Sequence, residues 1–419
     1  MKNPLNILLD YQKEIRICVL ALIALIAFTT LAIEFRQAVR DDQYFLANED
    51  ETIYYGSAQV FAGSGSLQAE SCNFEDVSKV GKFNWYGPGY NAVYGSVQLL
   101  FGHSWSLFIR FHFVLALLVI LLVLIMPDHW ENKLMVVTAL LISETFTTYI
   151  FSYFPEMLHF FFSGVLMFLL VLIYRKNEKR SLIYLYIAAV FLFTLCRVTT
   201  IFWLAALLPM GQNWRKRILF LLIFVFGVAI AIVYMKIFTA PPFAPQMFKL
   251  EELYSFNLGS FFINTISATW DNAKQIAMLN SVQVNFLLVL MVIVAVNYFK
   301  SRDKLQLSVL LIALCLFGVL MAYYVVDRFF FVKQTAMLLP CLLVVAVRGP
   351  FPWIKWVVLL GFIYFWIPVN KDRADVINDH KLAYQKLIEN KPLQDAFQQI
   401  REVVVPDEDV VILDRKSVV

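Results

Sequence analysis

Apolar residues form long runs along most of the chain, and polar residues are confined to the stretches between them. A helix needs roughly 20 mostly apolar residues to cross a bilayer, and fewer where other protein shields it. The runs predict eleven spans, near residues 15–33, 104–126, 134–152, 157–174, 181–196, 200–212, 217–238, 284–299, 305–325, 330–347 and 353–369. The first run lacks a small-residue cleavage site and is long enough to span, so we interpret it as a membrane helix rather than a signal peptide.

Basic residues favour the cytoplasmic side of a membrane when they lie in short loops. Lys and Arg cluster in the N-terminal arm and in the loops at 175–180, 213–217, 300–304 and 348–355. Eleven spans place all of these clusters on one side. The pattern therefore predicts a cytoplasmic N-terminus and an extracytoplasmic C-terminus.

Composition agrees with a membrane protein. Of the 419 residues, 60% are hydrophobic and 16% are charged, whereas about 25% are charged in a soluble domain. The net charge of +4 is small, and we expect no nucleic-acid partner. The five cysteines are not spaced like a zinc site or a redox pair. We therefore expect an all-α polytopic membrane protein.

Three longer polar segments lie on the predicted outer side, at 34–103, 239–283 and 370–419. We treat residues 1–369 as the membrane domain, which includes the first two segments as loops. The last segment has a helical pattern over 374–404 and then an apolar alternation typical of a strand. It predicts a small α/β tail that leans on the membrane domain.

The first outer segment contains an acidic sequence, "NEDETIYY" at 48–55. Asn48 can cap a helix with Glu51 at its third position, and carboxylates in a first turn complement the helix dipole. Helix initiation alone explains the sequence equally well. The alternative is that these carboxylates act on a lipid headgroup from a short interfacial helix.

Two further outer stretches carry candidate chemistry. "GKFNWYGPGYNAVYG" at 81–95 holds Gly and Pro, which disfavour a regular helix, among aromatic rings that suit a membrane interface or a sugar face. In "SYFPEMLHFFF", Pro155 and Glu156 begin a helix, and His159 lies one turn later on the same face. Glu156 and His159 are a candidate metal pair, although residues that merely satisfy a helix end are the more common reading.

Cationic residues lie near the outer ends of several predicted spans: Arg110, Arg197, Arg328 and Lys333. An arginine there can bind a phosphate through two hydrogen bonds, or can extend toward the headgroups. Arg197, in the short "CRVTT" turn, has the least room to reach water. Glu144 lies inside the third span, where a carboxylate is either functional or a hydrogen-bonded packing group.

The order and sidedness of these motifs resemble the GT-C glycosyltransferases, membrane enzymes that use polyprenyl-phosphate sugars. The matching stretches are "DETIYY" from Asp50, "WYGPGY" from Trp85, "PEMLHFF" from Pro155 and "DRFFFVKQTAMLLP" from Asp327. Two features depart from the pattern: the second acid is Glu156, where many relatives have Asp, and the C-terminal segment is short.

The resemblance implies an inverting sugar transfer at the outer face of a bacterial inner membrane, from a polyprenyl-phosphate donor to an unidentified glycan, lipid or protein. Asp50 would be the general base, with Glu51 and Glu156 as further catalytic residues. Arg110, Arg197, Arg328 and Lys333 would bind the donor phosphate, and Tyr54, Trp85, Tyr86 and Tyr90 would contact the sugar or acceptor. No cofactor is certain, and a divalent metal at Glu156 and His159 stays open.

Two other classes remain as alternatives. A transporter or flippase of a lipid-linked glycan would show paired broken helices and charges at mid-membrane, whereas most charges here lie at span ends. An O-antigen polymerase or ligase would place its large outer loop late in the chain, whereas the acidic loop here comes first.

Overall fold

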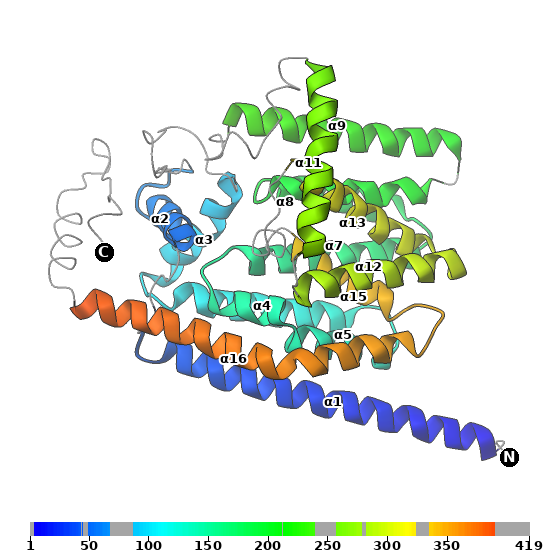
Figure 1. Ribbon diagram of the computed structural model, residues 1–419, viewed down its shortest axis with the longest axis horizontal. Coiled ribbons are helices and arrows are strands. Elements are labelled where there is room, and N and C mark those ends of the chain that lie inside the picture. The colour runs from blue at the N-terminus through cyan, green and yellow to red at the C-terminus, as the bar shows by residue number, and fades with distance from the viewer. Residues whose placement is uncertain are drawn as a thin grey trace.

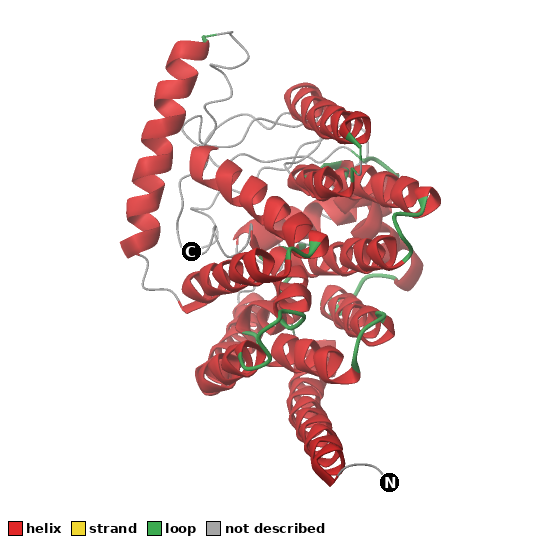
Figure 2. Ribbon diagram, turned by 90° about the vertical axis from the view of Figure 1, so that its right-hand side faces the viewer, coloured by secondary structure: helices red, strands yellow, loops and turns green. Residues whose placement is uncertain are grey.

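The computed structural model describes residues 4–42, 44, 49–67, 87–211, 213–238, 257–278, 282–323 and 335–389. Within these ranges the chain is helical and contains no strand (Figures 1 and 2). The α-helices are α1 (Pro4–Val39), α2 (Glu49–Ser64), α3 (Pro88–Phe101), α4 (Leu107–Ile125), α5 (Trp130–Ile142), α6 (Glu144–Thr148), α7 (Glu156–Arg175), α8 (Arg180–Thr194), α9 (Trp214–Phe238), α11 (Leu258–Met278), α12 (Val282–Ser301), α13 (Lys304–Tyr323), α15 (Leu338–Ala346) and α16 (Ile354–Glu389). Three 3₁₀-helices are η1 (Arg40–Asp42), η2 (Tyr149–Phe151) and η3 (Val198–Met210).

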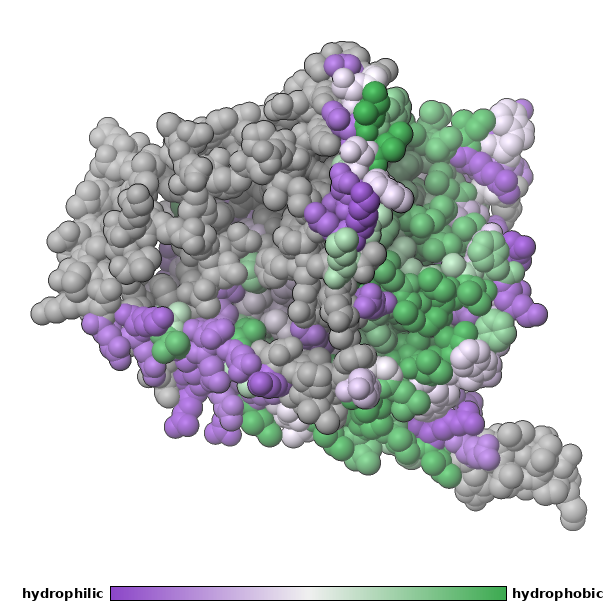
Figure 3. Space-filling view, in the orientation of Figure 1, coloured by the Kyte–Doolittle hydropathy of each residue, from purple (hydrophilic) through white to green (hydrophobic). Residues whose placement is uncertain are grey.

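Six helices among the described residues are long and apolar enough to cross a membrane, within α1, α4, α7, α9, α12 and α13. A seventh span results if α5 and the segment Glu144–Ile150 are counted together. Exposed apolar side chains gather in the right half of Figure 3, with hydrophilic residues along its right edge and others at the lower left. The chain is therefore a polytopic helical membrane protein, as the hydrophobic runs predict.

α1 and α16, the first and last helices of the described residues, run side by side in the same direction (Figure 1). The guanidinium of Arg16, in the first half of α1, lies 6.0 Å from the ring centre of Trp356, near the start of α16. About 18 residues later, Arg373 Nε lies 2.8 Å from Glu34 Oε2. At about 1.5 Å per residue these two contacts are about 27 Å apart, close to the hydrocarbon thickness of a bilayer.

The loops that carry the basic clusters meet at one end of the bundle. Lys304 pairs with Glu178 at 3.2 Å, Arg348 with Asp128 at 2.6 Å and Lys355 with Glu131 at 2.7 Å. The first pair joins the α12–α13 connection to the α7–α8 connection. The other two join the region between α15 and α16 to the region between α4 and α5, and Arg16 of α1 lies close to the start of α16. We call this the basic end, and the opposite end, where α2 and α3 lie, the acidic end.

The span predicted at 200–212 is a 3₁₀-helix, η3, of 13 residues. A 3₁₀-helix rises about 2.0 Å per residue, so η3 extends about 26 Å, farther than an α-helix of equal length. It is enclosed by α8, α9 and α13. Hydroxyl groups of Tyr186 and Ser308 donate to the carbonyl oxygens of Trp203 and Ala206, at 2.7 and 2.8 Å. Protein packing thus supports a span that is short in residues.

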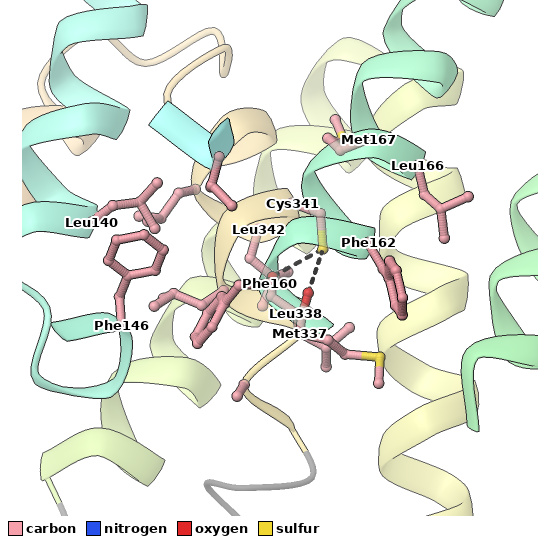
Figure 4. Packing of buried hydrophobic residues seen from close by; sticks show 14 of the residues in the cluster. Leu140, Phe146, Phe160, Phe162, Leu166, Met167, Met337, Leu338, Cys341 and Leu342 are labelled. Atoms are coloured by element: carbon pink, nitrogen blue, oxygen red, sulfur yellow. Dashed lines mark hydrogen bonds between the residues drawn. The ribbon is translucent and has the colours of Figure 1, made fainter. Parts of the chain in front are cut away.

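The span predicted at 134–152 is broken instead of continuous. α5 ends at Ile142, and the chain bends by 61° before α6 begins at Glu144. Ser143 caps α6 by accepting a hydrogen bond from the Phe146 N–H at 3.5 Å. Figure 4 shows the core at this bend, where Phe146 of α6 meets Phe160 of α7, with ring centres 5.2 Å apart, beside α15. The only break of this kind in the described residues involves a single span, without the second broken helix expected of a transporter.

The polar segments also contain helices. In 34–103, α2 is the short helix expected at the acidic sequence, and α3 follows it; in 239–283, α11 occupies part of the segment. α11 lies across the other helices in both ribbon views (Figures 1 and 2). α16 runs without interruption from the predicted last span to Glu389, past residue 370, where the tail is expected to begin. The strand predicted near the C-terminus lies outside the described residues.

Candidate functional site at the acidic end

The acidic sequence forms the beginning of α2. Glu49, Asp50 and Glu51 stand in its first turn, where carboxylates interact favourably with the helix dipole. The side chain of Asp50 lies outside the part of the chain that the structure describes. Glu51 is 1% exposed. A surface helix start would leave its carboxylates in water, so the burial of Glu51 indicates more than helix initiation.

Glu51 connects α2 to the segment that precedes α7. Its Oε1 accepts a hydrogen bond from the Tyr153 N–H at 2.9 Å. Next to it, the Tyr54 ring lies 6.0 Å from the Phe154 ring and 5.3 Å from the Tyr90 ring. The start of α2 therefore contacts both other outer stretches that the sequence singles out.

The Gly-Pro-Gly sequence at 87–89 lets α3 begin against the turn that carries Arg197. Pro88 occupies the first helical position, where its fixed φ and missing N–H are favourable, so the helix begins inside the stretch expected to resist one. Gly87 has φ +77°, and a Cβ there would lie 2.5 Å from the Leu195 carbonyl oxygen. Gly89 donates its N–H to that oxygen at 3.1 Å. Glycine is needed here for both conformation and space.

Glu156, His159 and Arg197 form a buried cluster. They are 0%, 2% and 4% exposed, respectively. Arg197 Nη1 lies 3.5 Å from Glu156 Oε1 and also contacts His159 Nδ1. Glu156 and His159 do share one helix face, as their spacing predicts. Because both side chains face the guanidinium of Arg197, this arginine is a cationic neighbour of each.

This arrangement bears on the metal hypothesis. A divalent ion between Glu156 and His159 would lie next to the Arg197 guanidinium, which repels it. Among the described residues, no group of three or more His, Cys, Asp and Glu side chains is arranged to hold a metal. The pair does not fit a metal site in this conformation, and we derive no chemistry from a bound ion.

The remaining predicted residues are distributed as follows. Tyr54 and Tyr90 are buried, 3% and 1% exposed, and the Tyr90 ring stacks on Tyr94 at 4.3 Å. Arg110 is exposed near the start of α4, away from the buried face of that helix. Trp85, Tyr86, Arg328 and Lys333 lie outside the described residues. Within the described residues, the fold brings together Glu51, Tyr54, Tyr90, Glu156 and Arg197.

Two buried basic residues of α16 join the acidic end and are absent from the sequence prediction. Arg373 donates to both carboxylate oxygens of Glu34, at 2.8 and 3.0 Å, and to the Thr147 hydroxyl at 3.2 Å. His380 Nε2 lies 3.6 Å from Glu51 Oε1. The helical pattern of the tail predicts a helix at these positions. It cannot predict that these residues are buried, because their acidic partners lie more than 300 residues earlier in the sequence.

Asp42 fixes the start of α4 from outside that helix. Its carboxylate accepts from the Ser106 N–H at 2.7 Å, the Trp105 N–H at 3.0 Å and the hydroxyls of Ser104 and Ser106, both at 2.6 Å. Burial would raise the pKa of Asp42, but these hydrogen bonds outweigh it and lower the pKa below its ordinary value. Asp42 is thus an ionised cap that joins η1 to α4.

Two tyrosines surround Glu51 as neutral groups. Burial raises the pKa of Tyr44 well above its ordinary value, and the negative charge of Glu51 raises it further. Burial likewise raises the pKa of Tyr153, with added repulsion from nearby groups that include Glu51. The Tyr44 hydroxyl donates to the Phe151 carbonyl, and the Tyr153 hydroxyl donates to the Tyr44 carbonyl at 3.1 Å. Both phenols remain protonated and hold the polypeptide around Glu51.

Comparison with known proteins identifies no relative: no protein family, curated protein or solved structure matches this chain.

Proposed function

We propose that this protein is a membrane glycosyltransferase that moves a sugar from a polyprenyl-phosphate donor to an acceptor at the outer face of a bacterial cytoplasmic membrane. The observation that carries the proposal is the convergence of four separate segments at the acidic end. These are the start of α2, the Gly-Pro-Gly start of α3, the start of α7 and the Arg197 turn. Three of them are the stretches whose order resembles the GT-C glycosyltransferases.

The proposed reaction assigns a separate task to each charged group. Asp50 takes the proton from the acceptor hydroxyl or amine as that group attacks the anomeric carbon, and the polyprenyl phosphate leaves. Arg197 faces the charge that develops on the leaving phosphate. Contacts with Glu156 and His159 hold its guanidinium in one orientation, so it needs little reorganisation during the reaction. Arg328 and Lys333 are proposed to share this task.

The proposal also fixes an orientation. Lys and Arg favour the cytoplasm, so we place the basic end there and the acidic end outside. The N-terminus is then cytoplasmic and the C-terminus extracytoplasmic. Eleven crossings result when the bent pair of α5 and Glu144–Ile150 and the shorter elements α8, η3, α15 and the apolar part of α16 are added to the six long spans. A lipid-borne donor would present its phosphate at the depth where Arg197 lies.

Accessibility of single cysteines tests the orientation. In a background without other cysteines, Gln59→Cys on α2 and Asp303→Cys at the basic end both replace exposed residues. A membrane-impermeant maleimide added to intact cells is expected to label position 59 and not position 303. Labelling of position 303 alone would reverse the orientation and refute the proposal.

The catalytic assignment is tested by mass spectrometry of cell-envelope glycans. Cells that lack the protein are expected to lose a sugar unit, and the wild-type chain restores it. Asp50→Asn is expected to reduce transfer by about 100-fold to 10,000-fold, the usual contribution of a general base. The matched control is Asp375→Asn, an exposed carboxylate of α16, which is expected to restore the sugar fully.

Two outcomes would contradict this assignment. Undiminished transfer by Asp50→Asn, at equal protein level, removes Asp50 from the mechanism. An unchanged glycan in cells without the protein removes the transferase proposal.

For the transport alternative, the purified protein in detergent is incubated with polyprenyl-phosphate sugars and with solubilised cell envelope from cells that lack the protein, which supplies the acceptor. Release of free polyprenyl phosphate without a gradient is expected, since a transporter would leave the donor intact.

A further inference from the structure

The second half of α16 is a polar helix with a buried face. Beyond its apolar part, Ile354–Tyr364, the helix continues to Glu389. Arg373, Ile377 and His380 on this continuation are buried, while Asp375 and Asp379 are exposed. Residues 373, 377 and 380 lie on one face of a helix. This face therefore packs against the rest of the protein at the acidic end.

His380 is enclosed by groups from three other parts of the chain. Its ring stacks on Tyr44, with ring centres 4.4 Å apart, and lies 5.8 Å from the Tyr153 ring. Its Nε2 faces Glu51 Oε1 of α2 at 3.6 Å. The two phenols remain protonated, so Glu51 is the only carboxylate among these three neighbours. The polar edge of the imidazole is thus directed at a buried carboxylate.

Glu51 needs such a partner. A buried carboxylate is strongly unfavourable unless hydrogen bonds or opposite charges compensate it. Tyr153 supplies a backbone N–H and His380 supplies a ring nitrogen, and both face the Oε1 atom of Glu51. Glu51 therefore joins three elements: α2, the segment before α7, and α16. Its position fixes the first turn of α2, in which Asp50 stands next to it.

We propose that His380 is a positioning residue for sugar transfer, which holds the first turn of α2 in its reactive place through Glu51. This inference rests on the proposed function, because it assigns α2 the catalytic base. It adds that the last helix completes the site formed by the early segments. His380 acts through Glu51 and does not contact the reacting groups.

Two substitutions separate the polar contact from simple packing. His380→Phe keeps an aromatic ring that can stack on Tyr44 but removes the nitrogen that faces Glu51. His380→Gln keeps an N–H donor but removes the ring. His129→Phe is the control, since His129 is exposed at the basic end. Each variant is compared with wild type in hydrogen exchange of the peptide that covers α2, and in the amount of glycan product at equal protein level.

We expect His380→Phe to lose both the protection of α2 from exchange and the glycan product, and His380→Gln to retain both. For His380→Phe, we expect amide exchange in the first turns of α2 to accelerate about tenfold or more while exchange in α7 and α13 is unchanged. Glycan product should fall by about 100-fold, the effect of a misplacement of about 1 Å. His380→Gln and His129→Phe should stay within about threefold of wild type on both measures.

Three outcomes overturn the proposal: wild-type behaviour of His380→Phe, equal losses in His380→Phe and His380→Gln, or faster exchange throughout the protein. The first shows that the nitrogen is dispensable, the second that only packing matters, and the third that the residue serves general stability. Absence of any glycan product from wild type would refute the transferase proposal instead, and the α2 exchange data would still decide whether His380 holds Glu51.

Discussion

The two ends of the helical bundle differ in how deeply they bury charge. At the basic end, the paired side chains are all partly exposed, from 11% for Glu131 and Glu178 to 46% for Lys304. At the acidic end, Glu156, Arg197, Glu51 and His380 are each at most 4% exposed. Exposed pairs contribute little to stability, whereas buried charges are costly unless geometry and hydrogen bonds compensate them.

The difference indicates what each end is for. Loops at the basic end connect helices and carry the Lys and Arg residues that favour the cytoplasmic side under our proposal, a task that needs no precise geometry. The acidic end holds its charged groups in fixed contacts between segments far apart in sequence. Buried ionisable groups in membrane proteins are rare and usually functional. The acidic end is therefore where substitutions should have large and specific effects.

The largest effect is expected for Arg197→Leu. This substitution removes the cation next to Glu156, and breaking a buried pair costs about 3–5 kcal/mol. The free energy of unfolding, measured by denaturation in mixed detergent micelles, should fall by that amount. The double variant Arg197→Leu/Glu156→Leu should recover most of the loss, because it removes both charges. If Arg197→Leu lowers the free energy of unfolding no more than Lys304→Ala does, the contrast between the two ends is refuted.

A smaller, pH-dependent effect is expected at Asp42. Hydrogen bonds lower its pKa in the folded protein, so the unfolded state binds the proton more readily. Its contribution to stability is therefore complete above the unfolded-state pKa of about 3.9 and is lost as pH falls through the lower folded-state value. The melting temperature of wild type, relative to Asp42→Asn, should be constant at neutral pH and should approach that of the variant in acid. If the difference in melting temperature between wild type and Asp42→Asn stays constant down to acidic pH, Asp42 is not the ionised cap described above.

The smallest effect is expected for Lys304→Ala at the basic end. Lys304 is 46% exposed, although its partner Glu178 is only 11% exposed, and ion pairs with a solvent-exposed member contribute about 0–1 kcal/mol. Thermal unfolding should change little, and raising the salt concentration should reduce even that small difference. A loss comparable with that of Arg197→Leu would show that both ends depend on charge to the same extent.

The hydrophobic pattern predicts most of the fold because membrane crossing imposes a simple rule of length and polarity. Helices occur in each of the eleven predicted spans, although only six pass the length and composition test, or seven with the bent pair. The break at Ser143 and the 3₁₀ geometry of η3 were not predicted. Both depend on neighbours that satisfy backbone groups, and those neighbours are remote in sequence.

For the site, the sequence predicts the early members and misses the late ones. Glu51 is noticeable because it lies in a dense acidic sequence, and Glu156 and Arg197 because they lie in short outer connections between predicted spans. His380 and Arg373 lie in a polar segment, where basic residues are ordinary. Only the packing of α16 shows that they are buried. The catalytic roles remain predictions that the glycan experiments test.

The parallel pairing of α1 and α16 has a consequence for how the protein is made. Arg373 and Glu34 are 339 positions apart, so the first helix enters the membrane long before its partner is synthesised. Only 22% of the apolar window of α1 is buried in the finished protein. Lipid can therefore solvate α1 until α16 is made, and the acidic end forms only after α16 has been synthesised. A ribosome that stops before α16 would release an inserted chain that lacks both Arg373 and His380, so that Glu34 and Glu51 would have no partner from α16.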